Sequence, residues 1–287
     1  MAGSLDVQWI HGSPNCSTNT DPPIQVHRYD EDTFIMRQSK CVDPQTSFEG
    51  PFMYLLFGDE RAMLLDTGAT PSPALFPIGA TVRGIINGWL AERGRQSIPL
   101  LICHSHAHED HARGDGQFAN QDVRIVPATF AGVRQFFGFT NWPEQRAKLE
   151  LGNRTLDVIP APGHEQAHIA FYDRRAKLLL SGDTLYPGLL VVRDWAAYRK
   201  SVARLKLFAD DNEITFILGA HIEMKSEPGK WFGYPQTFHP GEHVLQLETR
   251  HLLELHEAMT GMTSPRTDRH QDFIIQPVNL PFPPPDV

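Results

Sequence analysis

The segment HSHAHEDH, residues 104–111, places four histidines and two acids within eight residues, directly after the apolar run IPLLIC. Imidazole nitrogens and carboxylate oxygens are ligands that suit zinc, and in mixed sites also iron or manganese. His106 and His108 would point in different directions on a helix, so this spacing requires a loop. A solvated polar loop would account for one or two of the histidines but not for all of them. The segment therefore predicts a metal site at the end of a strand.

Other polar clusters along the chain share this position after an apolar run. APGH, SGD and GAH, which end at residues 164, 183 and 221, each follow a segment with the character of a strand. Between such segments, Val82, Ile85 and Trp89 recur at helical spacing, and Asp194 can cap a second amphipathic helix. The pattern predicts an α/β fold in which loops at strand ends carry the site.

The chain shows no internal repeat and no linker that would divide it. Its 287 residues, 41% of them apolar, can bury a sizeable core. We expect a single domain, 1–287, with an irregular N-terminal arm, 1–50, that carries a short strand near TFIMR. We also expect a C-terminal extension, 222–287, with one helix over 243–259 and a proline-rich tail.

Charge and cysteine content narrow the expected partners and location. A net charge of −8 without a basic cluster argues against nucleic acid as a partner. No apolar run approaches the roughly 20 residues of a membrane span, and the first residues lack the features of a signal peptide, so we expect a cytoplasmic protein without a membrane partner. Cys16, Cys41 and Cys103 do not form a disulfide framework. Cys16 and Cys41 could pair, but free thiols are the expectation.

The segment HAHEDH resembles the His-x-His-x-Asp-His signature of the metallo-β-lactamase-fold superfamily. The other sequence markers of that superfamily are present in the expected order over roughly residues 52–223. They match Asp66 in LLDTG, His164 in APGH, Asp183 in SGD and His221 in GAH. The resemblance implies a four-layer αββα sandwich, in which helices flank two mixed sheets.

The resemblance also implies a dinuclear site with two divalent ions, zinc in the first place, with iron or manganese as alternatives. One ion would be bound by His106, His108 and His164, and the second by Asp110, His111 and His221. Asp183 would bridge the two ions. Asp66 would orient a ligand histidine, because ligating imidazoles usually donate their other N–H to a carboxylate or carbonyl. His104 and Glu109 fall outside the ligand set.

The bridging aspartate narrows the expected reaction. True β-lactamases of this fold generally lack it, whereas glyoxalase II, lactonase, ribonuclease and phosphodiesterase relatives keep it. We expect a metal-bound hydroxide to attack a small ester, thioester or lactone, with Asp110 moving a proton to the leaving group. The alternatives are a persulfide dioxygenase-like oxidoreductase with one iron and a small-molecule phosphodiesterase.

Several residues near the markers have two interpretations. Tyr186 could donate a hydrogen bond to the substrate carbonyl or could pack beneath its loop. His168 is expected to be structural. Aromatic side chains could form the walls of a substrate pocket or a homodimer interface, although for any single one core packing is favoured. The pocket candidates are Phe136, Phe137, Trp142, Trp231 and Phe232.

Overall fold

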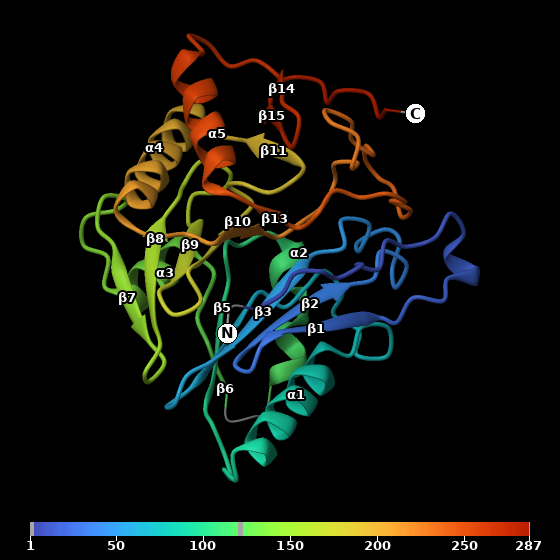
Figure 1. The fold of residues 1–287 in the computed structure, drawn as a ribbon, viewed down its shortest axis with the longest axis vertical. Helices are drawn as coiled ribbons and strands as arrows, with labels where there is room; N and C mark the ends of the chain where they lie inside the picture. The colour runs from blue at the N-terminus through green and yellow to red at the C-terminus, as the bar shows by residue number, and fades with distance from the viewer. Residues whose placement is uncertain (1–2, 120–122, 287) are drawn as a thin grey trace.

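The computed structural model of the chain describes residues 3–119 and 123–286, and two six-stranded mixed sheets form its centre (Figure 1). The first sheet runs antiparallel from β1 to β4 and parallel from β4 to β6. Its strands, in spatial order, are β1 (Ile24–Asp30), β2 (Thr33–Gln38), β3 (Phe52–Phe57), β4 (Ala62–Leu65), β5 (Leu100–Cys103) and β6 (Val123–Ile125).

The second sheet is antiparallel except where β10 and β12 pair in parallel. Its strands, in spatial order, are β13 (Gln246–Leu247), β12 (Phe216–Gly219), β10 (Leu178–Gly182), β9 (Ile169–Asp173), β8 (Thr155–Pro160) and β7 (Ala147–Glu150). A small third sheet contains β11 (Leu189–Val192), β15 (Ile274–Pro277) and β14 (Asp268–Arg269).

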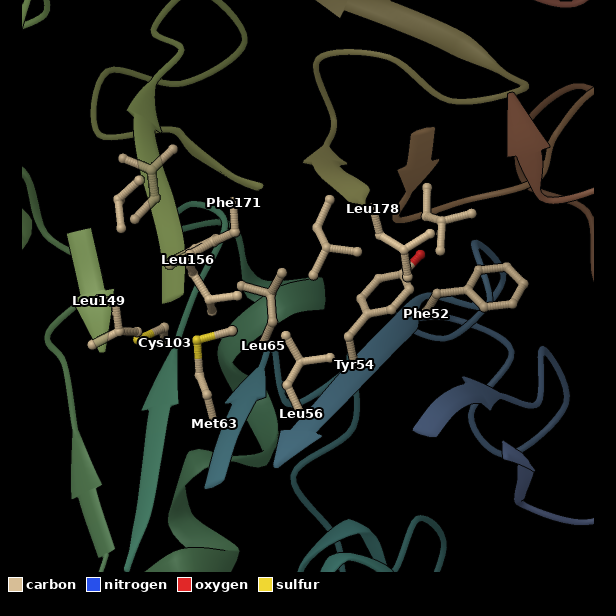
Figure 2. Close-up of a cluster of buried hydrophobic side chains, with 14 of the residues drawn as sticks. Phe52, Tyr54, Leu56, Met63, Leu65, Cys103, Leu149, Leu156, Phe171 and Leu178 are labelled. Carbon is tan, nitrogen blue, oxygen red and sulfur yellow. The ribbon is translucent and has the colours of Figure 1, made fainter. Parts of the chain in front are cut away.

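The two large sheets bury their facing sides against each other. Alternate residues of a strand point to opposite faces, so Tyr54 and Leu56 of β3 turn inward while Leu55 turns outward. Figure 2 shows side chains from both sheets directed toward this shared interior. The labelled residues are Phe52, Tyr54, Leu56, Met63, Leu65, Cys103, Leu149, Leu156, Phe171 and Leu178.

Helices cover the outer face of each large sheet. Val82 and Trp89 of α1 (Ile78–Glu92) pack on the outward residues of the first sheet. Helices α4 (Trp195–Asp211) and α5 (Thr249–Gly261) pack on the second sheet, on the opposite side of the molecule from α1 (Figure 1). The arrangement is the expected α/β sandwich with layers in the order α, β, β, α, and this prediction is confirmed.

The N-terminal arm is less irregular than predicted, because it contributes two strands, β1 and β2, to the first sheet where one short strand was expected. Other predicted elements differ from the observed ones mainly at their ends. The last helix begins at Thr249 and not at residue 243, because Gln246 and Leu247 pair with β12 as β13. The aromatic segment after β6 contains a short helix, α3 (Phe130–Phe137), capped by the Thr129 side chain. A four-residue helix, α2 (Glu109–Ala112), lies within the histidine cluster itself.

The cysteine prediction was wrong for one pair. Cys16 and Cys41 form a disulfide, whereas Cys103 is a buried free thiol. Their Cα atoms lie 5.0 Å apart although 25 positions separate them in the sequence, and the sequence alone does not reveal this proximity. Disulfides are uncommon in cytosolic proteins, so this one weighs against the expected cytoplasmic location, which stays a prediction.

Over residues 3–119 and 123–286, none of the helices combines the length and apolarity that a bilayer-spanning helix needs.

Backbone hydrogen bonds join the N-terminal arm to the C-terminal extension. Gly12 and Phe238 form a β-bridge, and the backbone N–H of His239 donates to His11 O at 2.9 Å. Beside this contact, Arg37 at the end of β2 is fully buried, and its Nη2 donates to Glu242 Oε1 at 2.7 Å. Burial opposes ionisation of Glu242, but the Arg37 guanidinium outweighs it and lowers the pKa of the carboxyl to about 2.

This ion pair predicts an acid-sensitive contribution to stability. The Glu242 pKa lies below its unfolded value, so the stabilisation is present above about pH 4.5 and is lost as the pH falls toward about 2. At neutral pH, Glu242→Gln should lower the free energy of unfolding by about 3 kcal/mol. The difference from wild type should shrink by about 2 kcal/mol between about pH 6 and about pH 3, measured by denaturant titration.

Glu92→Gln is the matched control, because the Glu92 carboxylate pairs with Arg28 at the exposed surface. This variant should show a much smaller pH-dependent difference. A Glu242→Gln difference that stays constant across the pH range would contradict the role assigned to the buried pair.

Candidate metal centre

The histidine cluster forms the turn from β5 into α2. Strand β5 ends at Cys103, and α2 begins at Glu109 with His108 as its N-cap residue. His106 and His111 are buried, whereas His108 and Asp110 are partly exposed. The turn therefore carries four polar side chains close together, two of them buried and two partly exposed to solvent.

The remaining candidates come from the ends of three strands of the second sheet. His164 follows β8, Asp183 follows β10 and His221 follows β12. The segment of His221 is also tied to the first sheet, because Phe52 N donates to Ala220 O at 2.8 Å. All three side chains thus converge on the octet where the edges of the two sheets meet.

Two groups of possible ligands result. His106, His108 and His164 form one group, and Asp110, His111, Asp183 and His221 form the other; within each group the ligand atoms lie within 4.8 Å of one another. His108 Nδ1 lies 2.8 Å from His106 Nε2 and 3.0 Å from His164 Nε2. The structure brings together all seven residues that the resemblance implies, in the same two sets.

Asp183 faces both groups with different oxygens. Its Oδ2 lies 3.4 Å from His164 Nε2 and 3.9 Å from His106 Nε2. Its Oδ1 lies 3.4 Å from His221 Nε2 and 3.6 Å from His111 Nε2. One carboxylate therefore spans the two groups, as a bridging ligand must.

The buried atoms of the second group fit a cation. Within the described residues, His111 Nε2, His221 Nε2 and Asp183 Oδ1 are buried and form no hydrogen bond of good geometry, although both imidazole nitrogens lie within 3.6 Å of a carboxylate oxygen of Asp110 or Asp183. Such atoms are costly to leave unpaired, yet here they converge on one another. Histidine and aspartate donors together suit zinc, iron or manganese, so the residues present fit divalent ions in both groups.

Hydrogen bonds behind the ligands set their orientation. Asp66 accepts from Ser105 N at 2.8 Å and from Ser105 Oγ at 2.9 Å, and its Oδ2 lies 2.9 Å from His111 Nδ1. His164 Nδ1 lies 2.8 Å from Val191 O. With Nδ1 engaged in this way, the Nε2 atoms of His111 and His164 point into the centre. Asp66 thus has the contacts that an orienting carboxylate requires.

The two groups differ in their protonation without ions. Burial lowers the pKa of His106 and His164, and lowers that of His108 to about 4, so the first group is neutral. Burial also opposes protonation of His111 and His221, but the carboxylates of Asp110 and Asp183 outweigh it and raise both pKa values. The second group therefore carries protons that an incoming cation would displace.

His104 and Glu109 lie outside the ligand groups, as expected. His104 Nε2 lies 2.9 Å from Asp115 Oδ1, and Glu109 pairs with Arg113 at the surface. The Tyr186 hydroxyl donates to Leu189 O at 2.6 Å, and its ring centre lies 5.4 Å from that of His221. These contacts are those of the packing alternative, and donation to a substrate would require Tyr186 to leave Leu189. That role stays a prediction.

The five aromatic pocket candidates all pack against other side chains. Trp231 is 1% exposed and lies in a small cluster with Met224 and Ile274, and Phe232 stacks on the His239 ring. Phe136, Phe137 and Trp142 pack against the core between the two sheets. Core packing accounts for every contact described here, and a contribution to a substrate pocket or a dimer interface stays a prediction.

Sequence reasoning missed one carboxylate beside the site. Glu223 is buried two residues after His221; it accepts from Leu189 N at 2.8 Å and from the Tyr234 hydroxyl. It thereby joins the start of β11 and the segment of Tyr234 to the segment that carries His221. The acid in the apolar run GAHIEM is the only trace of this role in the sequence.

Comparison with known families agrees with this geometry. The family model described as "Metallo-beta-lactamase superfamily" matches residues 47–249, well over half of the chain. The chain belongs to the metallo-beta-lactamase superfamily. The matched segment contains all seven candidate ligands and Asp66 of this superfamily member, so the resemblance expected from the histidine motif is confirmed.

The curated relatives are distant. The chain is 27% identical to human "Acyl-coenzyme A thioesterase MBLAC2" over 177 residues, 52% of this chain and 62% of the relative. It is 32% identical to "Hydroxyacylglutathione hydrolase" of Hahella chejuensis over 138 residues, 46% of this chain and 51% of the relative. The matches thus span about half to three fifths of these proteins. A solved "Metallo-beta-lactamase from Pontibacter korlensis" is 15% identical with a TM-score of 0.50, covers 83% of this chain and 100% of its own, and supports the fold alone.

The position of Asp183 predicts the effect of its removal on metal binding. Asp183→Asn keeps the shape of the side chain but removes the charge that faces both groups. We expect the variant to retain about one ion fewer per chain than wild type after dialysis, because a divalent pair would lose its shared anionic ligand. Elemental analysis of the dialysed proteins measures this directly.

Asp157→Asn is the matched control, because Asp157 is also buried but pairs with Arg174 on the second sheet. Its metal content should equal that of wild type. Retention of the full metal complement by Asp183→Asn would contradict the bridging arrangement.

Proposed function

We propose that this chain is a dinuclear metal-dependent hydrolase of small acyl substrates, with zinc as the ion and a thioester as the preferred substrate. The observation that carries the proposal is the Asp183 carboxylate, which turns one oxygen to each ligand group. Two relatives support the choice of bond, since their names describe hydrolases that act on acyl groups carried by coenzyme A or glutathione.

The buried and the partly exposed candidate ligands would have different roles in the centre. When bound, two divalent ions would lower the pKa of a water molecule and polarise the substrate carbonyl. His106, His164, His111 and His221 are buried and would hold the ions away from bulk water. His108 and Asp110 lie at the open side, where the substrate would enter.

The contacts of Asp110 support a role in proton transfer. Its side chain is 18% exposed, and its Oδ2 lies 2.9 Å from His111 Nε2 and 3.4 Å from His221 Nε2. Hydrolysis adds the oxygen of water to the acyl carbon and breaks the carbon–sulfur bond, so one proton must reach the departing thiolate. We assign this transfer to the Asp110 carboxylate.

A mononuclear iron oxygenase has no specific observation in its favour. It would leave the second group without a purpose, although three of the four members of that group are buried together. A phosphodiesterase would use the same seven residues, so a substrate panel has to separate it from an acyl hydrolase.

The proposal predicts a ranked response to substrates. Acyl-coenzyme A and acyl-glutathione should be hydrolysed faster than p-nitrophenyl acetate, a simple lactone or bis-p-nitrophenyl phosphate. Asp110→Asn should lower kcat by about 100-fold with little change in KM, because proton transfer is made in the transition state. Steady-state kinetics on metal-quantified protein test both points.

Glu92→Gln, which removes a carboxylate paired with Arg28 at the exposed surface, is the kinetic control and should keep wild-type constants. Protein with two ions per chain that hydrolyses none of the acyl substrates would overturn the proposal. Oxygen uptake by protein with one iron per chain would replace it with the oxygenase.

A further inference from the structure

The side chain of His168 contacts the backbone of Asp183, the residue whose carboxylate faces both ligand groups. The residue directly precedes β9 and is fully buried, but it belongs to neither ligand group. The backbone N–H of Asp183 donates to His168 Nε2 at 3.1 Å. A nitrogen that accepts a hydrogen bond carries no proton, so the proton of the neutral ring lies on Nδ1, 3.5 Å from Thr184 Oγ1.

The ring of His168 also packs against the ligands of the first group. It stacks on the His106 ring with centroids 5.1 Å apart and an interplanar angle of 24°. It meets the His164 ring edge-on, with centroids 6.2 Å apart. The uncharged ring of His168 thus lies against the side chains of His106 and His164 and also accepts the backbone N–H of Asp183.

Gly182 shows how closely the ring presses on the turn that presents Asp183. A Cβ at this position would lie 2.7 Å from His168 Nε2 and 2.8 Å from Ser105 Cβ, closer than side chains approach. Gly182 also has φ +51°, a conformation in which glycine is favoured. The imidazole and the glycine therefore fix one path for the backbone between β10 and Asp183.

The backbone of His168 is itself anchored to the metal-binding loop. Ile169 N donates to Ser105 O at 2.8 Å, and Ala161 N donates to His168 O at 2.8 Å. Ser105 is the residue whose side chain and N–H are held by Asp66. The position of the imidazole is thus set by the same loop that carries His106 and His108.

We propose that His168 is a positioning residue of the metal centre, which holds the Asp183 carboxylate across both ligand groups by accepting the Asp183 N–H. Without it that N–H would be buried without a partner, and the turn would move to satisfy it. The inference rests on the binding of two ions, which the proposed function shares, but it does not depend on the substrate.

Two substitutions separate hydrogen bonding from space filling. His168→Phe keeps a flat ring but removes the acceptor, whereas His168→Gln can place its amide oxygen near the position of Nε2. We expect His168→Phe to bind one of the two zinc ions about 10- to 100-fold more weakly, as is typical when a partner behind a ligand is lost. We expect His168→Gln to stay within about threefold of wild type.

The readout is zinc affinity and stoichiometry, from competition with a chromogenic chelator, together with Tm of the metal-free proteins. His251→Phe is the control for loss of a buried histidine elsewhere, because His251 lies in the capping box of α5. It should lower Tm without changing zinc binding.

Wild-type zinc affinity in His168→Phe would overturn the proposal, and so would equal losses in His168→Phe and His168→Gln. If His168→Phe loses one zinc site and His168→Gln keeps it, while wild type hydrolyses no acyl substrate, the positioning role stands and the proposed function fails.

Discussion

The carboxylate of Asp66 is the contact on which the metal-binding loop depends. Strands β4 and β5 are parallel neighbours, so the residue after β4 lies beside the loop that leaves β5. Asp66 adopts φ 65°, donates its N–H to Cys103 O at 2.9 Å, and uses both carboxylate oxygens on Ser105 and His111. A buried carboxylate with this many donors fixes the loop before any ion arrives, and the directions of the octet side chains follow from it.

The centre is divided electrostatically as well as geometrically. Three buried or half-buried imidazoles on one side are neutral, whereas on the other side histidines and aspartates neutralise one another. Asp183 belongs to the second group but faces both groups with its two oxygens, which is why the path of the backbone before it matters. Gly182 and His168 restrict that path, so a residue without a ligand atom has a direct influence on the geometry of the centre.

The sequence predicts which seven side chains lie together, because the motif segments that carry them come after apolar strands whose hydrophobic pattern is local. That these side chains bind ions stays a prediction. The sequence does not predict the contacts of His168, which is expected only to be structural, or those of Glu223, because a side chain that accepts one backbone N–H leaves no spacing pattern. The Cys16–Cys41 disulfide and the start of α5 are also set by distant contacts, namely the meeting of two loops and the pairing of β13 with β12. The orientation of Tyr186 depends on one carbonyl, Leu189 O, whose position the sequence does not encode locally.

The buried ion pair between Arg37 and Glu242 joins residues that are 205 positions apart in the chain. All six strands of the first sheet are synthesised before Glu242, so Arg37 lacks this partner until late in synthesis. His221 and Glu242 are synthesised much later and close together, so the last metal ligand and the partner of this arginine arrive at nearly the same time. Neither the candidate metal centre nor the ion pair between Arg37 and Glu242 can therefore be complete until this C-terminal part of the chain has been made.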